Sequence, residues 1–189
     1  YMSYGLKRSL RICYKIFVPT QSVKNDIIKY FPKSKDKILV IGFGFDRKNL
    51  ENKICPKKNQ FLYIGRIELK KNSLKLVEGF EIFFKENSDY KLVLAGKPGF
   101  GFEKIKNKID QSNSNVELLG YVSEEQKNVL QRESKALLLV SEEEGFGIPV
   151  LEGFDWGTSV IASDIPTLRE VGGDACIYVN NQNPKDIAD

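Results

Sequence analysis

The segment Glu144-Gly145-Phe146-Gly147-Ile148-Pro149-Val150-Leu151-Glu152 says most about the fold of this chain. It follows an apolar run, 136–140, that is typical of a buried strand, and it leads into an apolar sequence typical of a helix. Its glycines permit a tight turn, because they adopt backbone conformations that other residues avoid. Pro149 suits the first turn of a helix that begins near Ile148. The segment therefore predicts a strand, a turn and a helix.

The same turn predicts an anion-binding site. The first amides of a helix lack intrahelical partners and attract negative charge. Glu144 and Glu152 would flank such a site, and carboxylates accept hydrogen bonds from sugar hydroxyls. A ligand with both phosphate and sugar, a nucleotide sugar, would satisfy both features. The alternative is that these carboxylates stabilise the helix dipole without a ligand, with 142–144 as a solvated charge run.

The composition limits the chemistry. The chain has 189 residues, 41% of them hydrophobic and 29% charged, as expected of a soluble globular protein. Cys13, Cys55 and Cys176 are far apart and lack metal-ligand spacing, which favours a reduced, cytoplasmic setting. The chain has no histidine, so a Ser-His-Asp triad, a Cys-His pair and a histidine general base are excluded. Any chemistry must use carboxylates, lysine, arginine, hydroxyls and backbone dipoles.

Positive charge is concentrated near the start of the chain. Residues 1–60 contain 14 Lys or Arg against 4 Asp or Glu, whereas the whole chain has a net charge of +4. A basic segment fits an anionic membrane surface, a nucleic acid or a lysine-rich solvated surface. No helix-turn-helix, zinc-finger or aromatic single-strand pattern accompanies the lysines, so we expect no nucleic-acid partner.

Short apolar runs alternate with amphipathic ones along the chain. The predicted strands are 15–18, 38–41, 61–64, 92–95, 116–119, 137–140, 159–162 and 176–179. The predicted helices are 21–31, 72–86, 103–110, 124–131 after Ser123, and 148–155, with a further one beginning after Asn183-Pro184. Several strands are apolar on both faces, as in a parallel sheet covered by helices. The pattern predicts a doubly wound, Rossmann-like α/β fold.

Informative residues follow several of these strands. In open α/β sheets, ligands bind at the carboxyl ends of the strands. Gly65 and Arg66 follow the strand 61–64, and Lys71 stands at the start of the next helix. Arg66 and Lys71 could therefore reach one diphosphate, the arginine as a fork and the lysine as a point charge.

Several segments together resemble the donor half of family 4 retaining glycosyltransferases of the GT-B fold, from about Lys15 to the last residue. The segments that carry the resemblance are Gly65-Arg66-Ile67-Glu68 with Lys71-Asn72, Leu94-Ala95-Gly96-Lys97-Pro98-Gly99, Leu119-Gly120-Tyr121-Val122-Ser123, Ser141 with 144–153, 157–163, and 170–175. The segment 144–153 with its sequel 157–163 is the most specific of these.

The resemblance implies a domain division. Residues 1–20 would be the tail of the N-terminal acceptor domain with the interdomain crossover. Residues 21–189 would form the C-terminal donor domain, the C-terminal half of a GT-B fold, truncated at its C-terminus. We therefore expect the chain to be part of a longer protein, and to transfer little or no sugar by itself.

The resemblance also implies residue roles. Arg66 and Lys71 would neutralise the diphosphate leaving group, so no metal and no further cofactor are expected. Glu144 would bind hydroxyls of the transferred sugar and Glu152 those of the ribose. The remaining donor-binding residues are Gly65, the amides of Gly145, Phe146, Gly147 and Ile148, and Lys97, Tyr121 and Val122 around the base.

The implied function is transfer of a hexose, from GDP-mannose or a UDP-sugar, to a polysaccharide or lipid-linked acceptor with retention of configuration. The acceptor would bind the N-terminal domain, and the whole protein would be cytoplasmic, with peripheral association at the inner face of the membrane. The alternatives are a GT-B-type sugar-nucleotide epimerase and a noncatalytic nucleotide-binding domain.

Overall fold

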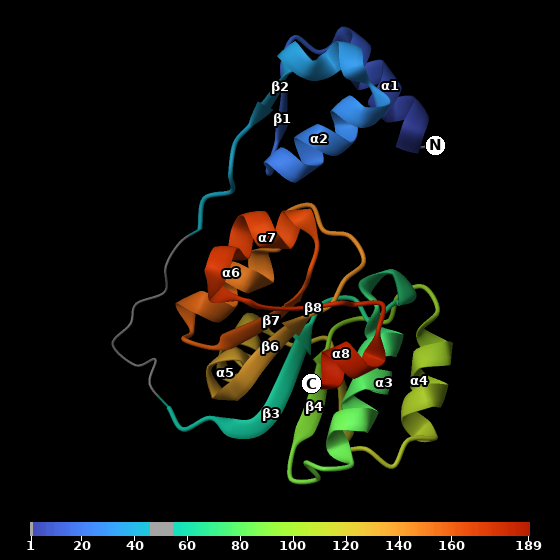
Figure 1. Ribbon diagram of the computed structural model, residues 1–189, viewed down its shortest axis with the longest axis vertical. Helices are drawn as coiled ribbons and strands as arrows, with labels where there is room; N and C mark the ends of the chain where they lie inside the picture. The colour runs from blue at the N-terminus through green and yellow to red at the C-terminus, as the bar shows by residue number, and fades with distance from the viewer. Residues whose placement is uncertain (1, 46–54) are drawn as a thin grey trace. The chain divides into compact units, whose positions relative to one another are not determined.

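The computed structural model describes residues 2–45 and 55–189 of the chain (Figure 1). The chain divides into two compact units, Tyr1–Asp46 (unit 1) and Arg47–Asp189 (unit 2). The domain division of the whole protein expected after residue 20 stays a prediction. Within unit 1, the second short strand pairs with the first and not with the large sheet.

Unit 1 is a small α/β unit. Its elements are α1 (Met2–Ile12), β1 (Ile16–Val18), α2 (Gln21–Tyr30), the 3-10 helix η1 (Pro32–Lys37) and β2 (Ile38–Val40). The strands pair in parallel, with Ile16 opposite Ile38. Helix α2 begins where the Thr20 hydroxyl accepts a hydrogen bond from the Val23 amide at 3.2 Å, an ordinary N-cap.

Unit 2 contains a six-stranded parallel sheet with the strand order β5-β4-β3-β6-β7-β8. Its strands are β3 (Lys58–Ile64), β4 (Lys91–Ala95), β5 (Val116–Gly120), β6 (Ser134–Leu139), β7 (Ser159–Ser163) and β8 (Ile177–Val179). Its helices are η3 (Leu69–Lys71), α3 (Ser73–Phe84), α4 (Phe102–Asp110), α5 (Glu124–Glu133), α6 (Ile148–Asp155), α7 (Pro166–Gly172), η4 (Gly173–Ala175) and α8 (Pro184–Ala188).

Helices cover both faces of the sheet, and each face has its own core. In β4, Leu92 and Leu94 belong to one apolar cluster, whereas Val93 and Ala95 belong to the other. This alternation is what a strand buried on both faces requires. Helices α3, α4 and α8 contribute to the first cluster, and α5, α6 and α7 to the second. The arrangement confirms the predicted doubly wound α/β fold.

The strand order places a crevice between β3 and β6. From β3 the chain adds β4 and β5 on one side, and then returns to add β6, β7 and β8 on the other. The direction of winding therefore reverses at the β3–β6 pair. Ligands of open α/β sheets bind at such a reversal, beyond the carboxyl ends of the strands. The residues that follow β3 and β6 therefore lie where a ligand of this sheet is expected to bind.

Candidate functional site

A cavity of about 320 Å³ lies beyond the carboxyl ends of β3 and β6. From the β3 side it is lined by Tyr63, Ile64, Gly65 and Lys71, and from the β6 side by Leu139, Ser141, Glu144, Phe146, Gly147, Ile148 and Pro149. Of the residues predicted from the sequence to bind a donor, six therefore line one cavity: Gly65, Lys71, Glu144, Phe146, Gly147 and Ile148. They come from two loops separated by more than seventy positions in the sequence.

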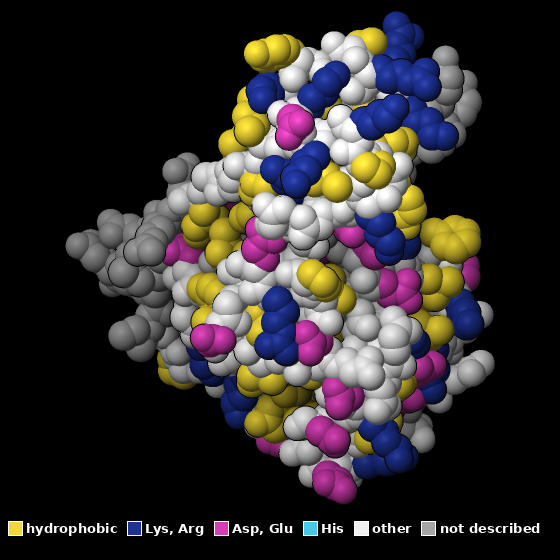
Figure 2. Space-filling view, turned by 45° about the horizontal axis from the view of Figure 1, so that its top comes forward, with side chains coloured by type: hydrophobic (Ala, Val, Ile, Leu, Met, Phe, Trp, Pro, Cys, Tyr) yellow, Lys and Arg dark blue, Asp and Glu magenta, His cyan; other side chains and the backbone are white. Residues whose placement is uncertain are grey.

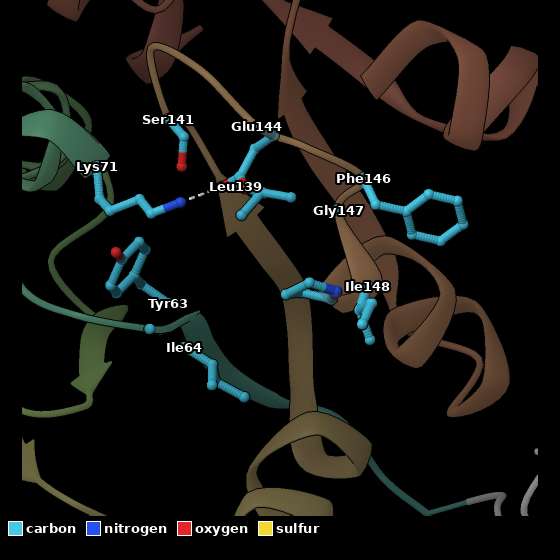
Figure 3. A pocket seen from close by; sticks show the side chains of 11 residues that line it. Tyr63, Ile64, Lys71, Leu139, Ser141, Glu144, Phe146, Gly147 and Ile148 are labelled. Atoms are coloured by element: carbon cyan, nitrogen blue, oxygen red, sulfur yellow. Dashed lines mark hydrogen bonds and ion pairs between the residues drawn. The ribbon is translucent and has the colours of Figure 1, made fainter. Parts of the chain in front are cut away.

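Lys71 and Glu144 reach toward one another across this cavity (Figure 3). The Lys71 ammonium donates a hydrogen bond to Glu144 Oε1 at 2.8 Å, and the two side chains are 31% and 15% exposed. A cation and a carboxylate thus stand side by side in a partly buried site. Such a pair offers one contact for an anionic group and one for hydroxyl groups on the neighbouring part of a ligand.

Helix α6 begins at the wall of this cavity. Its N-cap is Gly147, which has φ +95° and provides no side-chain cap. A Cβ atom at this position would be strained at this φ and would lie 2.6 Å from Leu168 Cδ2, so another residue would also have to displace the Leu168 side chain. The start of α6 therefore places the Ile148 amide and the positive end of the helix dipole at the cavity, since Pro149 has no N–H and the Val150 amide donates to Gly147 O. Gly145 lies in the same turn but does not line the cavity.

The β3 side of the cavity depends on close backbone packing. A Cβ atom at Gly96 would lie 1.8 Å from the Gly65 carbonyl oxygen, so the turns after β3 and β4 approach one another only because residue 96 is glycine. The Gly65 amide in turn donates to Ala95 O at 3.0 Å.

Tyr63 forms part of the floor. Its ring is 1% exposed, and its hydroxyl donates to the Arg66 carbonyl oxygen at 2.7 Å. Burial raises the pKa of Tyr63, and the negative charges of Glu144 and Glu68 act in the same direction. The phenol therefore stays protonated and holds the turn that follows β3.

Arg66 lies on this turn but does not line the cavity. Its side chain is exposed, and its guanidinium has no hydrogen-bond or ion-pair partner within residues 2–45 and 55–189. The sequence placed Arg66 and Lys71 at one diphosphate. The structure brings Lys71 together with the α6 turn, whereas Arg66 extends from the adjacent backbone into solvent.

Glu152 lies one turn into α6, outside this cavity, and its carboxylate is held from α5. Lys127 donates to Oε1 at 2.8 Å, and Gln131 donates to Oε2 at 3.1 Å. Partial burial acts to lower the pKa of Lys127, but hydrogen bonds to Glu152 and Glu124 outweigh it, so this pKa is raised. Glu152 is thus a fixed carboxylate on the α5 side of α6.

Lys97, Tyr121 and Val122 form a second group. The Lys97 ammonium lies 4.9 Å from the centre of the Tyr121 ring. Tyr121 and Val122 line a hollow of about 410 Å³ beside α5, together with Leu119, Glu125, Gln126, Val129 and Leu130. Tyr121 is 74% exposed, so this hollow offers an apolar, open surface of the kind that accepts a planar ring.

Sequence reasoning missed several residues that shape these sites. Lys127 and Gln131 are four positions apart on one predicted helix, and this spacing places them on one face, a signal that was available. Tyr63 is predicted only as a residue of the strand 61–64. Asn181 donates to the Ser141 carbonyl oxygen at 2.8 Å. No sequence pattern indicates this contact, because the two residues are forty positions apart and Asn181 follows a different strand, β8.

The fold and these strand-end loops define a Rossmann-like α/β domain with a ligand site where the direction of winding reverses. Residues 45–189 match the family model described as glycosyl transferases group 1, and the chain belongs to that family.

Named relatives agree with this family. The chain is 28% identical to the O-antigen chain mannosyltransferase RfbU of Salmonella typhimurium over 187 residues, which cover 98% of this chain and 52% of that protein. It is 31% identical to the serotype-specific mannosyltransferase WbdA of Escherichia coli over 131 residues, 68% of this chain but 16% of WbdA. The chain therefore spans about half of the first relative and a small part of the second.

The crystal structure of TarM has the same fold. It superimposes with a TM-score of 0.83 at 23% identity, over 98% of this chain and 37% of TarM. A second TarM structure, of a complex that contains UDP, gives a TM-score of 0.82 at 19% identity, over 98% of this chain and 38% of that one. At this level of identity the comparison establishes the fold, and the α/β arrangement is that of the C-terminal half of GT-B glycosyltransferases.

Proposed function

We propose that this chain is the donor-binding half of a retaining hexosyltransferase. The donor would be a nucleotide-diphosphate sugar, GDP-mannose or a UDP-sugar, and the acceptor a polysaccharide or lipid-linked saccharide. Family membership and the mannosyltransferase relatives support the reaction class. The TarM complex with UDP supports a nucleoside diphosphate as the leaving group.

The observation that carries the proposal is the Lys71–Glu144 pair at the start of α6. In a nucleotide sugar, the terminal phosphate and the sugar ring are covalent neighbours. A cation and a carboxylate 2.8 Å apart match this adjacency, the ammonium facing the phosphate and the carboxylate facing the sugar hydroxyls. The Ile148 amide and the dipole of α6 would add positive field at the same phosphate.

The chemistry follows from charge. As the bond from the sugar to the diphosphate breaks, negative charge grows on the leaving phosphate. Lys71, the Ile148 amide, and Arg66 after a rotation of its unpaired side chain, would stabilise that charge in the transition state. The acceptor hydroxyl would attack the sugar on the face from which the diphosphate leaves and give its proton to a donor phosphate oxygen. This route needs no histidine and retains the configuration.

The base and ribose would extend from the cavity along α6 toward α5. Glu152 would bind the ribose hydroxyls, and the hollow at Tyr121 and Val122 would take the base, with Lys97 beside it. The 2.8 Å pairing of Glu152 with Lys127 supports this assignment, since a carboxylate held in one orientation can accept two adjacent hydroxyls without further ordering.

A binding experiment on the chain tests the proposal. Calorimetry with GDP, UDP and ADP should detect binding of at least one diphosphate, and Lys71→Ala should weaken it. The adjacent, exposed Lys70 provides a matched control, since Lys70→Ala removes the same charge outside the cavity. If the folded chain binds none of the three, the proposal is wrong. If one of them binds, assays of sugar transfer by the whole protein from labelled GDP-mannose and UDP-sugars would identify the donor.

A lipid-linked acceptor would place the whole protein at a membrane surface. In unit 1, Lys and Arg side chains gather on the face seen in Figure 2. The exposed cations of unit 1 are Lys7, Arg8, Arg11, Lys15, Lys29, Lys33 and Lys35. Within the described part of the chain, no helix is long and apolar enough to cross a bilayer. We therefore propose peripheral association through charge. Co-sedimentation with anionic but not with zwitterionic vesicles, reversed by salt, would support it.

A further inference from the structure

A chain of buried polar side chains lies behind the cavity. Asn72, Asn181, Ser141 and Ser163 are 3%, 8%, 0% and 0% exposed. They come from the loops that follow β3, β8 and β6 and from the last residue of β7. Apart from Ser141, none of them lines the cavity. Their hydrogen bonds nevertheless connect its two walls.

On the β3 side, the connection starts at Asn72, the residue after Lys71. Asn72 has φ +59° and is the one residue other than glycine with positive φ in the described ranges 2–45 and 55–189. It stands at the N-cap of α3, but its side chain does not cap that helix. Its amide donates instead to the backbone carbonyl of Asn181. A group that would ordinarily cap its own helix is therefore used to bind a distant loop.

On the β6 side, the connection ends at the Ser141 carbonyl. Asn181 Nδ2 and Ser163 Oγ both donate to this oxygen, each at 2.8 Å. Both lone pairs of the carbonyl are thus used. The Ser141 hydroxyl is buried and finds no partner within the described residues, and it points toward the gap between Lys71 and Glu144 (Figure 3). Glu144 follows three residues later.

We propose that Asn181 is a positioning residue that fixes the Ser141–Glu144 loop against the Lys71 turn. Its backbone carbonyl receives Asn72 and its side chain holds Ser141, so one residue bonds both walls of the cavity. Moving either wall would leave a buried polar group without a partner, which the native state avoids. Asn181 thereby sets where the Lys71 ammonium and the start of α6 meet one phosphate. This inference rests on the proposed function for its ligand.

The test compares nucleoside diphosphates with monophosphates, using GDP and GMP, and UDP and UMP, on the 189-residue chain. Asn181→Ala should weaken diphosphate binding by about fivefold to tenfold, because displaced walls no longer share the terminal phosphate. Monophosphate binding, which depends more on the base and ribose contacts, should change by less than about twofold. Asn180→Ala is the matched control, since Asn180 is the adjacent amide but is exposed and does not bond either wall.

A double-mutant cycle separates positioning from general stability. In a Lys71→Ala background, Asn181→Ala should have a smaller effect on diphosphate affinity, because the ammonium with which the α6 turn is aligned is absent. Asn72→Gly removes the hydrogen bond from Asn72 to the Asn181 carbonyl. Glycine is used because it accepts the left-handed backbone conformation of residue 72, in which alanine would be strained. The Asn72→Gly variant should reproduce the selective loss of diphosphate affinity even if Asn181→Ala fails to fold.

Two results would overturn the inference alone. One is an equal loss of diphosphate and monophosphate affinity in both Asn181→Ala and Asn72→Gly, which would indicate a structural role only. The other is an undiminished effect of Asn181→Ala in the Lys71→Ala background. A wild-type chain that binds none of the four nucleotides would overturn the proposed function, and this inference with it.

Discussion

The cavity between β3 and β6 and the hollow beside α5 are built in different ways. The cavity contains a partly buried ion pair, Lys71–Glu144, above the buried Tyr63. Its walls are connected by the buried side-chain amides of Asn72 and Asn181. The hollow consists mainly of surface side chains, with Tyr121 74% exposed and Lys97 above its ring. The cavity therefore holds groups in fixed positions, whereas the hollow offers contact area that can vary without disturbing the fold.

This difference has a functional consequence. Stabilisation of developing charge requires groups that are already in place when the bond breaks. Recognition of a base needs area and a few polar contacts, which exposed residues can provide. We expect substitutions in the cavity to affect turnover strongly, and substitutions in the hollow to affect donor affinity weakly. The predictions that follow test this contrast.

The largest effect is expected for Lys71→Ala in the whole protein. Removing the ammonium leaves the leaving phosphate without its partly buried cation, and turnover should fall by about a hundredfold or more. Steady-state transfer assays with the identified donor would measure it. Lys70→Ala, one position earlier and exposed, should keep nearly wild-type turnover. A wild-type rate in Lys71→Ala would remove this residue from the site.

Arg66→Ala tests whether a solvent-exposed cation belongs with the cavity. If Arg66 rotates onto the donor diphosphate, turnover should fall on the order of a hundredfold. The melting temperature should not change, because the guanidinium has no partner in the described part of the chain. Unchanged turnover would confine the phosphate site to Lys71 and the α6 turn.

Much of the fold was predictable from the sequence, since its strands are apolar on both faces and its turns contain glycine. The helix start at Ile148 was correct, because Gly147 and Pro149 mark it in the sequence. Helix α1 was missed, because Gly5 and adjacent cations interrupt its apolar pattern. Helix α7 was missed because it has only seven residues, although Pro166 at its first position was a usable signal.

The candidate site was predictable in position but not in detail. The carboxyl ends of parallel strands meet at one edge, so the strand assignment placed the Lys71 and Glu144 loops at the same edge, whereas the β3–β6 pairing that makes them neighbours did not follow from it. The outward direction of Arg66 did not follow, because a side-chain direction depends on the turn that carries it. The role of Asn181 did not follow from the sequence either, because it depends on β8 lying beyond β7 at the end of the strand order.

Gly147→Ala tests how strongly the cavity wall is fixed. A Cβ atom at φ +95° and 2.6 Å from Leu168 Cδ2 combines backbone strain with overpacking. The expected loss of stability is about 2–4 kcal/mol, seen as a fall of several degrees in melting temperature. Gly145→Ala is the matched control in the same turn, because a Cβ atom there meets nothing within 4 Å. Equal effects of the two substitutions would contradict a glycine requirement specific to residue 147.

Lys127→Met tests the fixed carboxylate between the two regions. It leaves Glu152 with Gln131 alone, and the less ordered carboxylate should weaken donor binding by about threefold to tenfold, the scale of one hydrogen bond. The exposed Lys106→Met, which breaks a surface pair with Asp110, is the control and should leave donor affinity unchanged.

The raised pKa of Lys127 also predicts that the Lys127–Glu152 pair does not change near neutral pH. A lysine whose pKa is higher in the folded chain contributes stability that is complete below its unfolded pKa and is lost as the pH rises through the folded value. Since the ordinary lysine pKa is about 10.4, wild-type donor affinity should stay level between about pH 7 and pH 9. A steep decline in affinity within that range, absent in Lys127→Met, would contradict a raised Lys127 pKa, because the ammonium would then lose its proton below about pH 9.

The smallest effect is expected for Tyr121→Ala. The exposed ring would lose a stacking contact with the base, so donor affinity should fall by about twofold to tenfold while turnover at saturation stays the same. Tyr14→Ala in unit 1 is a close control, since Tyr14 is 88% exposed and also has a lysine, Lys15, over its ring at 5.8 Å. A loss of turnover in Tyr121→Ala comparable to that of Lys71→Ala would remove the distinction between the two regions, because the hollow would then contribute to the chemical step and not only to affinity.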